Sequence, residues 1–208
     1  MQDTLCTWLV QSIVGSSTKL LREYIRAVRE TRHPKKLWVF DFDDTLVKTD
    51  ACTHVTSASG EKFDLSPGEY ALYERKPGDV FDYTDFEKLI NPRPVKWVNH
   101  ILLNVYIHHG AGAIVVLSAR SYSAPIRQYL DSIGLQDVEV ATLDTAAPEA
   151  KAKWIADRIV RDGLGAVEFF DDSHKNVAAV GGLRHLHPEV EVIARHIIYN
   201  RIASLSLQ

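Results

Sequence analysis

The feature that most constrains the fold is a set of short apolar runs that alternate with helical patterns. The runs lie at 37–40, 113–117, 138–143, 166–170 and 190–195. The helical patterns between them lie at 95–108, 123–133, 148–162 and 175–183. Continuous apolar runs are typical of strands buried on both faces, and regular alternation with helices is typical of parallel sheets. We therefore expect an α/β fold in which helices cover both faces of a five-stranded parallel sheet.

Polar residues follow three of these runs at the point where each strand ends. The first run is followed by the segment Asp41 to Thr45, the second by Ser118, and the fourth by Asp171 and Asp172. Ligands of parallel sheets collect beyond the carboxyl ends of the strands, at the point where the strand order reverses. The sequence therefore predicts that these side chains converge on one site.

Three carboxylates, those of Asp41, Asp43 and Asp44, fall within four residues. Carboxylates this close raise one another's pKa, so a cation is expected among them, and Mg2+ with oxygen ligands is the simplest candidate. Alternation along an extended chain puts Asp41 and Asp43 on one side. One of them can then attack as a nucleophile while the other gives a proton to the leaving group. Asp44 is interpreted as a turn residue.

The acidic segment matches neither a calcium loop nor a receiver module. A calcium-binding EF-hand loop that began at Asp41 would need Gly at its sixth position and Glu at its twelfth, where this chain has Leu46 and Cys52. A phosphoacceptor receiver module would need its accepting Asp at the end of a later central strand, where this chain offers Ser118. The acidic segment is therefore better explained by an enzyme active site.

Bulk composition limits the partners and the compartment. A formal net charge of -3 argues against a protein that binds nucleic acid mainly by charge, although a local basic patch remains compatible with it. Two cysteines, Cys6 and Cys52, do not make a disulfide framework, which favours the cytoplasm. No apolar stretch reaches the ~18 residues of a membrane span, so we expect no membrane partner.

We expect a single domain over 1–208 with two additions to the sheet. Residues 1–33 read as a helical segment with one basic face, which is either solvated or in contact with a phosphate backbone. Residues 48–90 read as a flap or minimal cap, because a functionless loop of this length is unusual. Nine acidic and five basic residues lie between 48 and 88. The flap's aromatic residues either stack on a ligand or form its own small core.

Three segments resemble the motifs of one enzyme superfamily. Residues 39–46 (VFDFDDTL) resemble motif I of the haloacid dehalogenase (HAD) superfamily of Mg2+-dependent phosphotransferases. Residues 117–120 (LSAR) are similar to motif II, and residues 169–176 (FFDDSHKN) are similar to motif IV. The resemblance implies a HAD-type Rossmannoid fold with strand order 5-4-1-2-3 and the flap inserted after the first strand.

The resemblance also implies roles for single residues. Asp41 would be the nucleophile that forms an aspartyl-phosphate, and Asp43 the general acid and base. Mg2+ would be held by Asp41, by the backbone carbonyl of Asp43 and by Asp172, while Ser118 would bind the transferred phosphoryl group. Supporting roles around the metal and the substrate would fall to Thr45, Arg120, Asp171 and Asn176. Arg120 is equally well explained by a structural ion pair with a carboxylate.

Motif III of the superfamily needs a lysine, and the sequence offers two. Lys151 and Lys153 flank the apolar stripe of the helix predicted over 148–162, on opposite sides, so periodicity does not choose between them. The superfamily often has the lysine three residues before an apolar or aromatic pair. This spacing favours Lys151, with Trp154 and Ile155 as the pair, and leaves Lys153 as the alternative.

The resemblance suggests a substrate class. Ser118-Ala119-Arg120 and the spacing from Lys151 to Trp154 are similar to a branch related to RNA and DNA end repair, which includes polynucleotide phosphatases. The implied substrate is a nucleotide or a short nucleic-acid end, with long nucleic acid left open because the flap is acidic. A phosphoprotein phosphatase and a small-metabolite phosphatase are the alternatives among enzymes. An alternative of another class is a phosphate-binding module without turnover.

Overall fold

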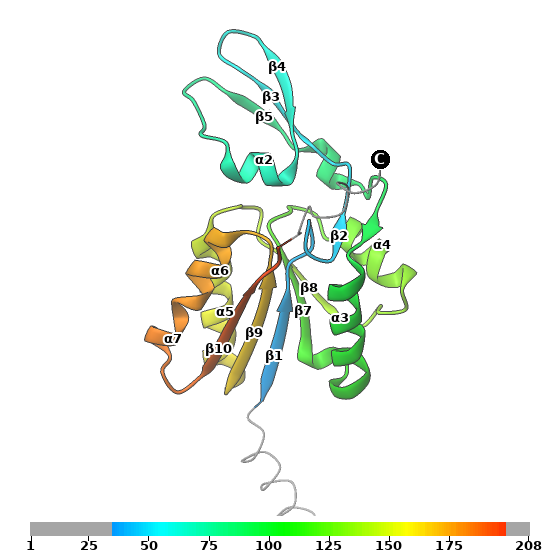
Figure 1. The fold of residues 1–208 in the computed structure, drawn as a ribbon, viewed down its shortest axis with the longest axis vertical. Helices are drawn as coiled ribbons and strands as arrows, with labels where there is room; N and C mark the ends of the chain where they lie inside the picture. The colour runs from blue at the N-terminus through cyan, green and yellow to red at the C-terminus, as the bar shows by residue number, and fades with distance from the viewer. Residues whose placement is uncertain (1–34, 199–208) are drawn as a thin grey trace, which may run out of the picture. The chain divides into compact units, whose positions relative to one another are not determined.

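The computed structural model describes residues 35–198, and its centre is a five-stranded parallel sheet (Figure 1). The strands follow the order β10-β9-β1-β7-β8 across the sheet. Their bounds are Lys36–Phe40 for β1, Ile114–Ser118 for β7, Glu139–Thr142 for β8, Ala166–Asp171 for β9 and Glu191–His196 for β10. The predicted α/β class with five parallel strands is confirmed.

The helices fall between the strands, as the sequence pattern predicts. They are α3 (Lys96–His109), α4 (Ala124–Ser132), α5 (Pro148–Asp162), α6 (His174–Gly181) and α7 (Leu183–Leu186). The single helix predicted over 175–183 is therefore two helices, divided at Gly182. A short 3-10 helix, η2 (Ala111–Ala113), precedes β7.

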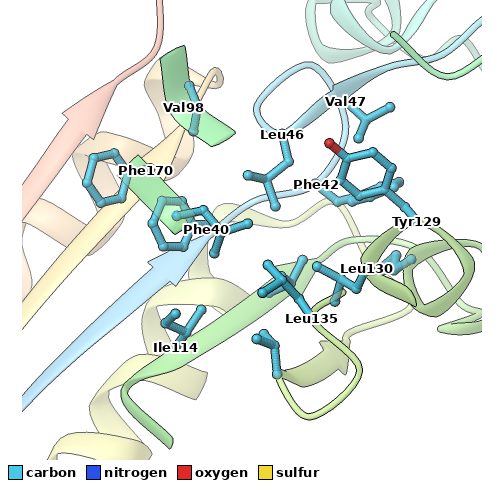
Figure 2. Packing of buried hydrophobic residues seen from close by; sticks show 14 of the residues in the cluster. Phe40, Phe42, Leu46, Val47, Val98, Ile114, Tyr129, Leu130, Leu135 and Phe170 are labelled. Carbon is cyan, nitrogen blue, oxygen red and sulfur yellow. The ribbon is translucent and has the colours of Figure 1, made fainter. Parts of the chain in front are cut away.

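Two buried clusters lie on opposite faces of the sheet because successive side chains of β1 point to opposite sides. Phe40 packs with residues of α3 and α4, and its ring stacks on Phe170 at a centroid distance of 4.7 Å (Figure 2). Val39 packs with residues of α5, α6 and α7 on the other face. Both side chains are fully buried. Helices therefore cover both faces, and the sheet is the shared wall of the two cores.

The register of the sheet brings the carboxyl ends of neighbouring strands level. Phe40 at the end of β1 pairs with Val116 of β7 and with Phe170 of β9. In turn His196 of β10 pairs with Asp171. The main chain continues this alignment past β1, because Asp41 N donates to Phe170 O at 2.9 Å. Polar residues just after three different strands therefore meet at one edge.

The segment between β1 and α3 forms a separate substructure, which we call the flap. It contains a three-stranded antiparallel sheet in the order β4-β3-β5, formed by Lys62–Leu65, Thr53–Thr56 and Val80–Asp82. Helix α2 (Pro67–Leu72) begins at a capping box of Ser66 and Glu69, and the 3-10 helix η1 (Thr84–Glu87) follows β5.

The flap begins and ends at a short antiparallel ladder, which we call the flap root. Strand β2 (Val47–Lys48) pairs there with β6 (Arg93–Pro94), and Val95 N donates to Leu46 O at 2.9 Å. Asp50 accepts hydrogen bonds from Asn91 and Arg93. The excursion from the sheet therefore extends a few residues beyond the 48–90 predicted for it.

The aromatic residues of the flap pack on one another. Tyr70, Phe81 and Tyr83 form edge-on and stacked pairs at centroid distances of 5.8 to 6.3 Å, and Tyr73 packs on Phe63 and Phe81. The guanidinium of Arg75 lies over Tyr70 and Phe81. Of the two expectations for these aromatics, their mutual packing favours a small cluster of the flap's own, which is only half-buried and leaves Tyr83 41% exposed.

The predicted helix over 1–33 and its basic face lie outside the residues that the structure describes. Within 35–198, none of the helices combines the length and the apolar character that crossing a membrane requires.

Candidate active site

A buried lysine at the carboxyl edge of the sheet joins two carboxylates. Lys151 Nζ lies 2.6 Å from Asp41 Oδ1 and 2.7 Å from Asp171 Oδ2. The Lys151 side chain is 3% exposed and that of Asp171 is fully buried. A charged lysine is stable at such depth only where carboxylates pair with it. Residues from β9, α5 and the turn after β1 thus form the base of one site.

Helix α5 places one candidate lysine at this site and keeps the other away from it. Lys151 precedes the buried Ile155 by four residues and Ile159 by eight, so its stem follows the inward face toward the sheet. Lys153 points to solvent with a side chain that is 75% exposed, and it pairs with Asp157. The structure therefore brings Lys151, not Lys153, to Asp41.

The turn after β9 fixes the orientation of Asp171. Asp171 Oδ1 accepts a hydrogen bond from Ser173 N at 2.8 Å, and Asn176 Nδ2 lies 3.0 Å from both carboxylate oxygens. With Lys151 added, every oxygen of this carboxylate has a partner. The roles expected of Asp171 and Asn176 as supporting residues agree with this geometry.

Asp172 is the third carboxylate of the site. One oxygen each of Asp41, Asp171 and Asp172 lie within 4.8 Å of one another, a grouping that could hold a metal ion. Thr45, in the turn after β1, contacts Asp172 in the turn after β9. The Thr45 hydroxyl accepts a hydrogen bond from Asp172 N at 3.1 Å and lies 3.4 Å from Asp172 Oδ1. The buried Thr45 thereby ties the two acidic turns together.

The charges of this group are not balanced by its single lysine. Burial raises the pKa of Asp41 well above its usual range, and the neighbouring Asp171 and Asp172 add to that effect while Lys151 opposes it. Burial and the charge of Asp171 raise the pKa of Asp172 to about 7. For Lys151 burial alone would lower the pKa, but the two carboxylates outweigh it and raise the pKa above its usual value. Three ionised carboxylates would therefore leave negative charge beyond that of the one lysine, and the site must take up either protons or a cation.

The carboxylate of Asp43 lies outside this group and pairs with Arg120. Arg120 Nε donates to Asp43 Oδ2 at 2.8 Å, and Nη2 donates to Asp43 Oδ1 at 2.7 Å. This two-pronged pair corresponds to the structural ion pair expected as one of the two roles of Arg120. The side chain of Asp43 is 17% exposed, so it keeps some access to solvent.

Ser118 closes the neighbouring strand end. It is the last residue of β7, which pairs directly with β1, and its side chain is buried. Its hydroxyl accepts a hydrogen bond from Arg120 N at 3.2 Å. The structure thus places Ser118 one strand away from Asp41 at the same edge, as its position in the sequence predicts.

Sequence reasoning missed His196, which borders the site from the edge strand. His196 Nε2 lies 2.8 Å from Asp172 O, and its ring is 5.8 Å from that of His174. Both histidines are exposed. The sequence pattern that predicted the other site residues also applies to His196, because His196 is a polar residue at the carboxyl end of the fifth strand.

Comparisons with known proteins do not identify the chain. No model of a protein family matches it, and no curated protein matches it either. The geometry of the site and the resemblance of its motifs therefore carry the functional conclusion.

Proposed function

We propose that this protein is a Mg2+-dependent phosphomonoester hydrolase that acts through an aspartyl-phosphate. One observation carries the proposal: the Asp41 carboxylate lies directly after the central strand, 2.6 Å from a buried lysine and within 4.8 Å of two further carboxylates. A structural ion pair would not need three carboxylates around one lysine. Surplus negative charge of this kind suits a site that recruits a cation and a phosphate.

The residues divide the reaction between them. A carboxylate oxygen of Asp41 attacks phosphorus, the bond from phosphorus to the leaving oxygen breaks, and Asp43 gives that oxygen a proton. Water then attacks the phosphorus atom on Asp41 and loses a proton to Asp43, while the bond from phosphorus to the Asp41 oxygen breaks, which releases inorganic phosphate and restores the Asp41 carboxylate. Lys151 neutralises negative charge on the phosphoryl oxygens, and Ser118 orients them by a hydrogen bond. Phosphoryl transfer depends mainly on such positioning and charge stabilisation.

The acidic group fits Mg2+. Carboxylate oxygens are its preferred protein ligands, and the raised pKa values of Asp41 and Asp172 reflect negative charge that the protein alone leaves uncompensated. Asp41 and Asp172 would hold the ion, with the backbone carbonyl of Asp43 as a third ligand. When bound, Mg2+ would neutralise the negative charge between the attacking carboxylate and the phosphate.

The topology supports membership of the HAD superfamily. Counted along the chain, β1, β7, β8, β9 and β10 are strands one to five, so the order across the sheet reads 5-4-1-2-3. The flap lies between strands one and two, after the turn over 41–46. Both features support the proposal that the fold is of the HAD type.

The leading substrate class is a nucleotide or a nucleic-acid terminal phosphate. Its support is the resemblance of Ser118-Ala119-Arg120 and of the Lys151-to-Trp154 spacing to end-repair phosphatases. The flap's aromatics add no support, because they pack on one another. Phosphopeptides and small metabolite phosphates remain the alternative substrates.

A phosphatase panel tests the proposal. Purified protein with Mg2+ is incubated with mononucleotides, 3′- and 5′-phosphorylated oligonucleotides, sugar phosphates and phosphopeptides, and released phosphate is measured. We expect turnover of nucleotides or oligonucleotide ends, loss with EDTA, and loss in Asp41→Asn. Turnover of phosphopeptides alone would overturn the substrate class. Phosphate binding without turnover of any substrate would favour the non-catalytic module instead.

A further inference from the structure

The guanidinium of Arg120 makes contacts on two sides. Toward the sheet it forms the two-pronged pair with Asp43. Toward the flap, Nη1 donates to Phe86 O at 2.6 Å and to Lys88 O at 3.1 Å. One side chain therefore links the proposed general acid to two carbonyls of the flap.

The Arg120 guanidinium is buried, and protein groups surround it. The Arg120 side chain is 2% exposed, and its guanidinium lies 5.3 Å from the ring centroid of Phe42 and 5.2 Å from that of Phe86. Its three nitrogens already donate four hydrogen bonds to protein oxygens. A guanidinium with its donors used in this way has little capacity left to bind a substrate phosphate.

The two carbonyls belong to the limb by which the flap returns to the sheet, residues 84–88, which we call the return limb. It consists of η1 and the residue after it. Asp85 within it also accepts a hydrogen bond from Cys52 N at 3.1 Å, which connects the limb to the start of β3. The return limb is thus held to the rest of the flap and, through Arg120, to the turn that carries Asp43.

We propose that Arg120 is a positioning residue that couples the docking of the return limb to the orientation of the Asp43 carboxylate. The role in the reaction rests on the proposed function, whereas the coupling itself is a property of the fold. When the return limb is docked, two carbonyls fix the guanidinium, and the guanidinium fixes the carboxylate. The two-pronged pair fits the ionised form of Asp43, which accepts the proton of the attacking water. When Asp43 carries the proton for the leaving group, the contact to the protonated oxygen must loosen, and the other contact keeps the carboxyl group in place.

Coupling of this kind is reciprocal, so it can be tested from both ends without measuring activity. Hydrogen–deuterium exchange is followed over 84–88 in metal-free protein for Arg120→Ala, Asp43→Asn and the double variant. We expect each single variant to exchange roughly tenfold faster than wild type, since each removes hydrogen bonds to a buried charge. The double variant is expected to exchange no faster than Arg120→Ala alone.

Arg127→Ala is the matched control. Arg127 is also an arginine that donates to main-chain carbonyls, but these belong to Gln136 and Val138, before β8, and not to the flap. Its helix α4 packs beside η1, so the control tests whether loss of an arginine from a neighbouring element is enough to disturb the return limb. It is expected to leave exchange over 84–88 unchanged. Unchanged exchange in Asp43→Asn, or additive effects in the double variant, would overturn the coupling even if Arg120→Ala were poorly folded.

Measurements of phosphatase activity provide a second test of the positioning role of Arg120. Arg120→Ala and Arg120→Lys are expected to lose at least about tenfold more kcat/KM on phenyl phosphate than on p-nitrophenyl phosphate, because only the poorer leaving group depends strongly on a proton from Asp43. In an Asp43→Asn background, Arg120→Ala is expected to add no further loss. Equal losses on both substrates, or a gain in activity, would contradict the positioning role.

The two arms separate the two proposals. Coupled exchange together with no turnover of any phosphate by the wild type would reject the proposed function and leave the coupling intact. Turnover together with uncoupled exchange would reject the coupling and leave the proposed function intact.

Discussion

Lys151 Nζ lies 2.6 Å from Asp41 Oδ1, and the lysine that makes this contact is 3% exposed. The same nitrogen contacts Asp171 at 2.7 Å. One buried cation therefore pairs with two carboxylates, and a third, Asp172, lies beside them with no ion pair of its own among the contacts described for residues 35–198. This imbalance is what makes the site chemically distinctive.

Replacing the two lysines of α5 separates a site residue from a surface residue. Lys151→Ala is expected to lower kcat by about 10²-fold or more, as removal of a preorganised charge usually does. It is also expected to cost about 3 kcal/mol in the free energy of unfolding, because two buried carboxylates lose their partner. Kinetics on p-nitrophenyl phosphate and urea unfolding measure the two effects.

Lys153→Ala is the control for this pair of measurements. It removes only an exposed ion pair with Asp157, which contributes at most about 1 kcal/mol. Equal, small effects of the two substitutions would remove Lys151 from the site.

Mg2+ is expected to stabilise the protein through the carboxylates of Asp41 and Asp172. A ligand at 100 times its Kd adds ~2.7 kcal/mol to folding, which corresponds to roughly 5–10 °C in Tm for a chain of this size. Asp172→Asn should abolish the shift, whereas Asp157→Asn on the surface of α5 should retain it. A full shift in Asp172→Asn, measured by thermal denaturation with and without EDTA, would place the ion elsewhere.

Without metal, stability should fall as the pH rises from about 4 to 7. Asp172 has a pKa of about 7 in the folded protein because it is buried beside Asp171, against 3.8 as its ordinary value. Between these values the native state binds a proton that the unfolded chain has lost, so the native state is favoured at the acid end. The loss is on the order of 3 kcal/mol.

Urea unfolding in EDTA at several pH values measures this slope. Asp172→Asn cannot titrate and should show a flatter dependence than wild type over the same range. Parallel curves for the two proteins would show that the Asp172 carboxyl group does not keep its proton in the native state.

A buried hydrogen-bond network under the flap root should contribute measurably to stability. Tyr129 donates to Asn99 Oδ1 at 2.7 Å, and Asn99 Nδ2 donates to Leu46 O at 2.7 Å. Tyr129→Phe leaves a buried amide oxygen without its partner and should cost about 1–3 kcal/mol in unfolding free energy. Tyr106→Phe, which removes an exposed bond to Asp137, should cost far less.

Much of the fold was predictable from the sequence because hydrophobic periodicity determines where the strands and helices lie. The apolar runs around Val39, Val115 and Phe169 correspond to strands that are buried throughout in β7 and β9 and mostly buried in β1, and their polar ends meet as the carboxyl-edge rule requires. The break at Gly182 was missed, since the apolar pattern continues across it while the helix does not.

The fine structure of the site was less predictable because it depends on distances between segments. Lys151 and Lys153 both flank the apolar stripe as a whole, so the sequence left two candidates. The spacing of four and eight residues from Lys151 to the buried Ile155 and Ile159, together with the approach of α5 to the sheet, separates them. Arg120 could be assigned two roles, because the flap carbonyls that use its donors leave no mark in the sequence. For the same reason the flap aromatics could not be assigned to a core before their mutual packing was seen.

The flap root has an evolutionary consequence. Since Val47 and Pro94 are cross-strand partners, the chain leaves the sheet and returns to it at nearly the same point. Excursions of different length and shape can begin and end on such a ladder while the strands that carry Asp41, Ser118 and Asp172 stay in place. The carboxylate site and the insertion beside it can therefore diverge at independent rates, so that relatives with the same chemistry need share little sequence between these two positions.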